Sequence, residues 1–127
     1  MSRPTFQLYV KDFVTGTSMM SLAEVGAYTR LLCLAWDQEP CATLPDDEEK
    51  IRRMAGADKD EWKTIREAVM DKFPKSEQFK GRRINKRLRE QFDEVEEYSE
   101  NMSKRGKKGA AARWTKNDPG AAEPDEE

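Results

Sequence analysis

Apolar side chains recur at helical spacing in the first part of the chain and predict its main core helix. A stripe at i, i+3 and i+4 runs to about Gln38. Ser21 and Glu24 form a capping box at its start, and Pro40 ends it. The stripe consists of Leu22, Val25, Tyr28, Leu31, Leu32, Ala35 and Trp36.

Two shorter helices are predicted next. One starts in Leu44-Pro45-Asp46-Asp47, runs to about Ala55 and ends at Gly56. The other starts with an Asp58/Glu61 capping box and runs to about Lys72. The short junction around Gly56 is typical of a helix-turn-helix corner. The inward positions are Ile51, Met54 and Ala55 in the first, and Trp62, Ile65, Val69 and Phe73 in the second.

Two segments have β character. Residues 6–10 alternate apolar and polar side chains and predict a short strand, followed by a turn over 12–17. Residues 78–84 predict a hairpin that turns at Lys80-Gly81 and could pair with the early strand. Three helices followed by a basic hairpin indicate a mainly α, winged-helix-like fold, that is, a helix-turn-helix plus a wing.

A long C-terminal helix is expected from Asn85. Leu88, Phe92, Val95 and Met102 form one stripe, which either lies along the first helices or pairs with another chain. Gly106 and Gly109 weaken the helix. The expected domains are a winged-helix-like domain over 1–103, a basic segment over 104–117 and a disordered acidic tail over 118–127. Glu90, Asp93, Glu94, Glu96, Glu97 and Glu100 lie opposite the stripe.

Basic charge is concentrated locally in this chain of 127 residues, whose formal net charge is -2. Residues 80–89 carry six positive charges and no negative one. Such clusters indicate a polyanionic partner, most often nucleic acid. Alternatively, the arginines pair with nearby Asp and Glu in a solvated hairpin. The candidate phosphate contacts are Lys80, Arg82, Arg83, Lys86, Arg87 and Arg89.

Two further groups of cations are candidates for nucleic-acid binding. Lys59, Lys63 and Arg66 share one face of the third helix and would meet a major groove, or they belong to a plain solvated face with its acidic neighbours. The second group combines cations with the aromatic ring of Trp114, and either binds nucleic acid or is a frayed helix end. This group comprises Lys104, Arg105, Lys107, Lys108 and Arg113.

Composition excludes much chemistry. With no histidine and two cysteines, the chain lacks a His-dependent catalytic triad and a closed structural zinc site, and we expect no enzyme activity, metal or cofactor. Cys33 is expected on an apolar helix face and Cys41 in a loop, without a disulfide between them. The acidic run Asp46–Glu49 is expected to stabilise a helix N-terminus. No signal peptide or membrane span is readable, so we expect a cytoplasmic protein of the bacterial host.

The chain resembles the YdaU-type domain of unknown function carried by phages and prophages. The resemblance covers residues 6–114 and is most specific in Leu22-Ala23-Glu24-Val25-Gly26-Ala27-Tyr28 and Asn85-Lys86-Arg87-Leu88. It implies a role beside helicase loaders or in replication-initiator-like proteins, with an inferred DNA-binding activity. It supplies no catalytic residues.

Two functions are therefore expected. The first is a phage or prophage DNA-binding protein, on duplex or single strands, in replication initiation or its regulation. The second is a non-enzymatic adaptor or inhibitor that binds a replication or transcription protein, such as a helicase loader, or a second copy of itself. Its contacts would come from Phe92, Val95, Met102 and Trp114.

Overall fold

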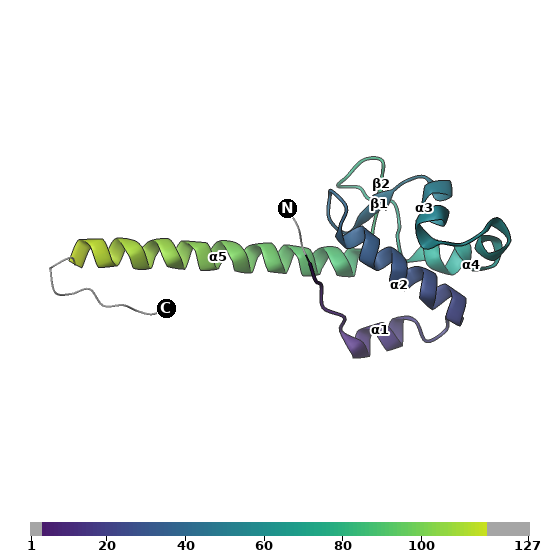
Figure 1. The fold of residues 1–127 in the computed structure, drawn as a ribbon, viewed down its shortest axis with the longest axis horizontal. Helices are drawn as coiled ribbons and strands as arrows, with labels where there is room; N and C mark the ends of the chain where they lie inside the picture. The colour runs from purple at the N-terminus through teal and green to yellow at the C-terminus, as the bar shows by residue number, and fades with distance from the viewer. Residues whose placement is uncertain (1–3, 117–127) are drawn as a thin grey trace. The chain divides into compact units, whose positions relative to one another are not determined.

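The computed structural model describes residues 4–116, with side chains described through residue 103. The chain is mainly helical with one small antiparallel sheet, as predicted (Figure 1). Two compact units divide between Phe92 and Asp93, and each is described by itself. The elements are α1 (Val10–Gly16), α2 (Leu22–Trp36), β1 (Thr43–Pro45), α3 (Glu48–Ala55), α4 (Lys59–Asp71), β2 (Arg82–Ile84) and α5 (Lys86–Lys116).

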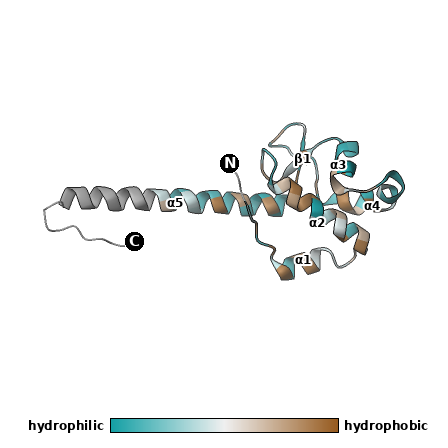
Figure 2. Ribbon diagram, viewed as in Figure 1, coloured by the Kyte–Doolittle hydropathy of each residue, from teal (hydrophilic) through white to brown (hydrophobic). Residues whose placement is uncertain are grey.

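Helix α2 is the centre of the core of the first unit. Its Leu31 and Ala35 are fully buried, and α3 and α4 pack against it (Figures 1 and 2). The Ser21/Glu24 capping box is present, as predicted. The predicted stripe is wrong at Leu22, which is 92% exposed because it is the first residue of the helix and lies beyond the core. Cys33 is also exposed, on the opposite side of the helix from the core.

The short helices begin and end where their caps require. Asp47 caps α3, so this helix begins at Glu48, later than predicted. Gly56 ends it with a left-handed backbone at φ 82°, which glycine adopts without steric cost. Asp58 and Glu61 form the predicted capping box of α4. The predicted inward residues Ile51, Trp62, Ile65, Val69 and Phe73 are all buried.

The sheet pairs other residues than those predicted. β1 and β2 are antiparallel, with Thr43 opposite Ile84 and Pro45 opposite Arg82. The predicted strand at 6–10 is wrong: residues 4–9 have no regular structure and α1 replaces the turn expected over 12–17. A side chain, and not a second strand, hydrogen-bonds this backbone. The Gln91 side chain accepts from the Gln7 N–H and donates to the Gln7 carbonyl at 2.9 Å.

The hairpin expected over 78–84 is formed differently. The turn includes Gly81, at φ 78°, but the returning arm is a single bridge between Lys75 and Arg83. The Ser76 N–H donates to the Arg82 carbonyl at 2.9 Å, and the Ile84 N–H donates to the Pro74 carbonyl at 2.8 Å. β2 is therefore hydrogen-bonded on both edges, to β1 and to the segment around Lys75.

Helix α5 begins as predicted, after Asn85. The Asn85 side chain accepts from the Leu88 N–H at 2.9 Å and donates to the Lys72 carbonyl at 3.0 Å. The predicted stripe divides along the helix. Leu88 is buried and Phe92 packs edge-on against Trp36, whereas Val95 and Met102 are exposed.

Candidate nucleic-acid interface

Two of the predicted phosphate-binding arginines hold the first unit together. Arg82 donates to the Thr43 hydroxyl at 3.0 Å and to the Gln38 side-chain carbonyl at 2.9 Å. Both acceptors lie at or just before β1, so Arg82 reinforces the pairing of the two strands through uncharged partners.

Arg89 likewise holds the start of α5 against the rest of the first unit. Its guanidinium lies over the rings of Phe79, at 5.0 Å, and Phe92, at 4.6 Å, and donates to the Cys41 carbonyl at 3.2 Å. A cation between two rings gains from both ring quadrupoles and packs as an apolar group. Arg89 is therefore a packing residue.

The next two arginines pair with carboxylates. Arg83 donates to Asp46 at 3.0 Å and to the Phe73 carbonyl at 2.9 Å, and 19% of its side chain is exposed. Arg87 forms an ion pair with Asp12. The four arginines thus do not present a row of free guanidinium groups. Sequence reasoning missed both carboxylates because they lie 37 and 75 residues away from their partners.

The lysines of the same region remain available. Lys80 and Lys86 are exposed, and no ion pair holds either of them among the residues that the structure describes. Lys75 is 72% exposed and lies 3.8 Å from Asp46. We define these three residues, which flank β2 along the chain, as the lysine patch. Residues 72–89 contain eight Lys and Arg and one carboxylate, Glu77, and two carboxylates from elsewhere in the chain, Asp46 and Asp12, pair with Arg83 and Arg87.

The cations of α4 are balanced by acid. Glu48, the first residue of α3, accepts from the Arg66 guanidinium, at 2.8 Å to one of its nitrogens, and from the Trp62 indole N–H at 2.7 Å. The Arg66 hydrogen bond is the main reason that the pKa of Glu48 falls to about 2. Lys59 and Lys63 are exposed, but so are their neighbours Asp60, Glu61, Glu67 and Asp71.

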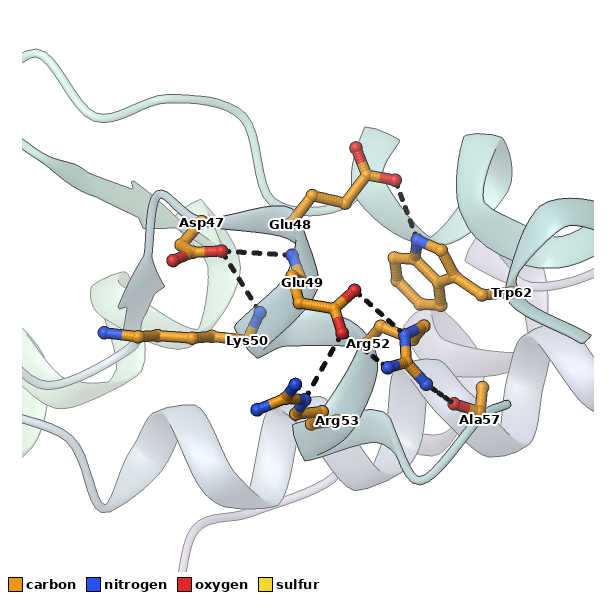
Figure 3. A network of polar contacts seen from close by, with 8 residues as sticks. All are labelled: Asp47, Glu48, Glu49, Lys50, Arg52, Arg53, Ala57 and Trp62. Atoms are coloured by element: carbon orange, nitrogen blue, oxygen red, sulfur yellow. Dashed lines mark hydrogen bonds and ion pairs between the residues drawn. The ribbon is translucent and has the colours of Figure 1, made fainter. Parts of the chain in front are cut away.

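The junction between α3 and α4 is fixed by a second polar network, which Figure 3 shows from close by. The Asp47 carboxylate accepts from the Glu49 and Lys50 N–H groups, at 3.1 and 3.2 Å. Arg52 joins Glu49, at 2.6 Å, to the Ala57 carbonyl, at 2.7 Å. This pairing lowers the pKa of Glu49 and raises that of Arg52. The acidic run is thus used for capping and ion pairing.

The second predicted basic cluster lies on the last turns of α5, whose backbone is helical to Lys116. The side chains of Lys104, Arg105, Lys107, Lys108, Arg113 and Trp114, like the expected tail over 118–127, lie outside the described residues, so their roles stay predictions. Within the described part, no cluster of three or more metal-ligating side chains exists. Its helices include none long and apolar enough for a membrane span.

Comparison with known proteins gives one match. A family described as "Protein of unknown function (DUF1376)" matches residues 4–93. The chain belongs to this family. The match ends beside the division between the two units, so the DUF1376 domain comprises α1 to β2 and the first turns of α5. No curated protein and no solved structure matches the chain.

Proposed function

We propose that this DUF1376 domain binds nucleic acid through the lysine patch beside β2, in a winged-helix-like arrangement. The observation that carries the proposal is that Lys75, Lys80 and Lys86 are exposed within residues 72–89, which contain eight Lys and Arg and one carboxylate. Phosphates that contact such a surface release condensed counterions, and that release drives binding. The resemblance to YdaU-type domains supports a setting in phage or prophage replication.

The element order supports the winged-helix interpretation. A three-residue junction from Gly56 to Asp58 joins α3 to α4, and the β1–β2 sheet supplies the wing. In this arrangement the arginines position the lysines: Arg82 and Arg83 hold β2, and Arg89 holds the start of α5. A fixed backbone around the patch reduces the ordering cost of binding. Lys80 and Lys86 then make the direct phosphate contacts.

A matched pair of charge reversals tests the site. We expect Lys80→Glu/Lys86→Glu to weaken duplex binding at fixed salt by 100-fold or more, on the order of 1–2 kcal/mol per lost contact. Lys59→Glu/Lys63→Glu on α4 makes the same change in net charge and should weaken binding by less than about 10-fold.

Each of the other outcomes contradicts part of the proposal. Equal losses in both variants would mean a general effect of net charge. A loss of affinity confined to the α4 variant would assign binding to α4, the second helix of the helix-turn-helix. Unchanged affinity in both variants would remove the proposed site.

A second candidate function is protein binding through α5, because three apolar side chains in the described part of this helix are exposed. They are Val95 at 49%, Tyr98 at 67% and Met102 at 44%. Phe92, predicted as a contact, packs against Trp36 instead, and its replacement by a charged residue would damage the core. Substitutions that test this surface therefore belong at Val95 and Met102.

A further inference from the structure

Helix α1 lies at the surface of the first unit and buries none of its residues. Val10 and Val14 are four residues apart, so they share one face, and they are 68% and 59% exposed. A helix of seven residues is too short to be stable alone, so its contacts with the rest of the unit hold it in place. The segments on either side of it are not helical (Figure 1).

Two oxygen acceptors of α1 contact two cations. The Asp12 carboxylate forms an ion pair with Arg87, and the Gly16 carbonyl, at the end of the helix, accepts from the Lys72 ammonium at 2.9 Å. Both side chains of the ion pair are more than half exposed, at 56% for Asp12 and 63% for Arg87. Exposed ion pairs contribute little stability, because water and salt screen them. Other anionic groups can therefore replace Asp12 at small cost.

Between these two acceptors along α1, one aromatic ring covers another. Phe13 stacks on Tyr28, with ring planes 5° apart and centroids 6.0 Å apart, and both rings are half-buried. The Tyr28 ring also packs edge-on against the fully buried Phe73, so it is fixed in the core. Lys72 lies 5.7 Å from the centroid of the Tyr28 ring. Burial raises the pKa of the Tyr28 hydroxyl, and the nearby charge of Arg87 opposes that rise.

These contacts resemble the way proteins hold a nucleotide of a single strand. An unpaired base stacks on an aromatic ring, and cations beside the ring bind the phosphates. In this chain the Phe13 ring lies where a base would stack. The Asp12 carboxylate occupies Arg87 as a phosphate would, and the Gly16 carbonyl occupies Lys72.

We propose that Tyr28, Lys72 and Arg87 form a second nucleic-acid site, which binds one nucleotide of a single strand and is masked by α1. A duplex does not fit the site, because its bases stack on each other and a paired base does not reach the ring. The inference goes beyond the proposed function, since none of the three residues belongs to the lysine patch.

The mask can open while the rest of the domain stays folded. The chain is anchored on both sides of α1, by the Gln91 side chain at Gln7 and by the Ser21 cap of α2. No apolar side chain between these two anchors is buried. Apparent affinity falls with the fraction of chains in which a site is open, so removal of the mask should raise the affinity for a single strand.

Removal of the mask tests the site directly. We expect Asp12→Asn/Phe13→Ala, the unmasked variant, to bind a labelled oligothymidylate about 10-fold or more tightly than wild type at low salt. Its affinity for duplex should rise by less than about 3-fold. Glu90→Gln makes the same change in net charge at an exposed residue of α5 and should change single-strand affinity by less than about 2-fold.

Three results would overturn the proposal. They are an unchanged single-strand affinity in the unmasked variant, an equal gain for duplex, and an equal gain in Glu90→Gln. Thermal melting checks the fold of each variant. Asp12→Asn alone keeps the aromatic stack and changes an exposed residue, so it should still tighten single-strand binding by about 3-fold. No gain in this folded variant would also overturn the proposal.

Further substitutions separate this site from the lysine patch. In the unmasked variant, Arg87→Glu should remove the gain in single-strand affinity, whereas Lys59→Glu, the same reversal on α4, should keep it. Lys80→Glu/Lys86→Glu should leave the ratio of unmasked to masked affinity unchanged. That ratio tests the second site even if the patch variant binds duplex normally and the proposed function fails. Loss of the gain in the patch variant would mean that the unmasked chain binds through the patch, and would overturn the proposal.

Hydrogen exchange of the wild-type chain measures whether α1 leaves its place. The Phe13 N–H donates to the Tyr9 carbonyl at 2.9 Å, and the Thr17 N–H donates to the Phe13 carbonyl at 3.0 Å. Saturating oligothymidylate should speed the exchange of both amide hydrogens, because their hydrogen bonds are lost when α1 is displaced. The amides of α2 should exchange no faster. Unchanged or slower exchange at Phe13 and Thr17 would mean that α1 stays in place, and would overturn the proposal.

Discussion

At the scale of single residues, Glu48 is the carboxylate with the clearest electrostatic role in the described part of the chain. Its pKa falls from 4.5 to about 2 because Arg66 and the Trp62 indole hydrogen-bond to the charged form. A lowered pKa in the folded state adds stability above the unfolded value, and this stability is lost as pH falls from about 4.5 to about 2. The side chain is 38% exposed, so solvent screening limits the effect.

We expect Glu48→Gln to destabilise the fold by about 1 kcal/mol at pH 7. Urea unfolding at several pH values should show the difference from wild type shrinking toward zero as pH approaches 2. Glu94→Gln, at an exposed residue of α5, should show no such trend. A Glu48→Gln difference that stays constant with pH would contradict this role.

Residues 80–89 contain both packed arginines and exposed lysines. Substitutions of the two kinds should differ in their effect on the free energy of unfolding. Arg89→Ala removes a cation from between two rings and breaks its hydrogen bond to the Cys41 carbonyl, so we expect a loss of about 2–3 kcal/mol. Lys86→Ala removes an exposed side chain and should change stability by less than about 0.5 kcal/mol. Equal unfolding midpoints in urea for the two variants would show that Arg89 is not part of the packing.

At the scale of elements, two glycines should respond oppositely to the same substitution. Gly26 lies inside α2 with open space where an added methyl group would lie, so Gly26→Ala should stabilise by about 0.5–1 kcal/mol. Gly56 ends α3 at φ 82°, and an added Cβ would lie 3.6 Å from Arg30 Nε, an ordinary contact. Gly56→Ala should therefore destabilise by about 1–2 kcal/mol through its backbone alone. Thermal unfolding measures both, and shifts of the same sign would refute the assignment.

Local signals predicted α2, α3, α4 and the start of α5, but not α1, which has no capping side chain. Each of these signals involves only residues that are close together in the sequence. They are the capping boxes at Ser21 and Asp58, the C-terminal glycine Gly56 and the apolar stripes. The strands depended on distant partners. Residues 6–10 alternate like a strand, yet the Gln7 backbone is hydrogen-bonded by the Gln91 side chain. Residues 44–47 resemble a helix start, but Thr43–Pro45 forms a strand because it pairs with Arg82–Ile84.

At the scale of the whole molecule, sequence predicted where basic charge gathers but not how it is used. Asp12 and Asp46 neutralise Arg87 and Arg83 across the fold, and Phe79 and Phe92 enclose Arg89. A pattern of charges along the chain carries no information on such partners. The apolar stripe of α5 is also divided: Leu88 and Phe92 pack in the core, whereas Val95 and Met102 are exposed.

The proposed nucleic-acid binding depends on a local excess of positive charge in a chain whose net charge is -2. The most direct test is the salt dependence of duplex binding by the wild-type chain, measured from about 50 to about 200 mM salt. We expect the logarithm of affinity to fall with the logarithm of salt at a slope of about -3 to -5, and Lys80→Glu/Lys86→Glu to reduce that slope by about 2. No binding at the lowest salt, or an affinity that does not change with salt, would contradict the account.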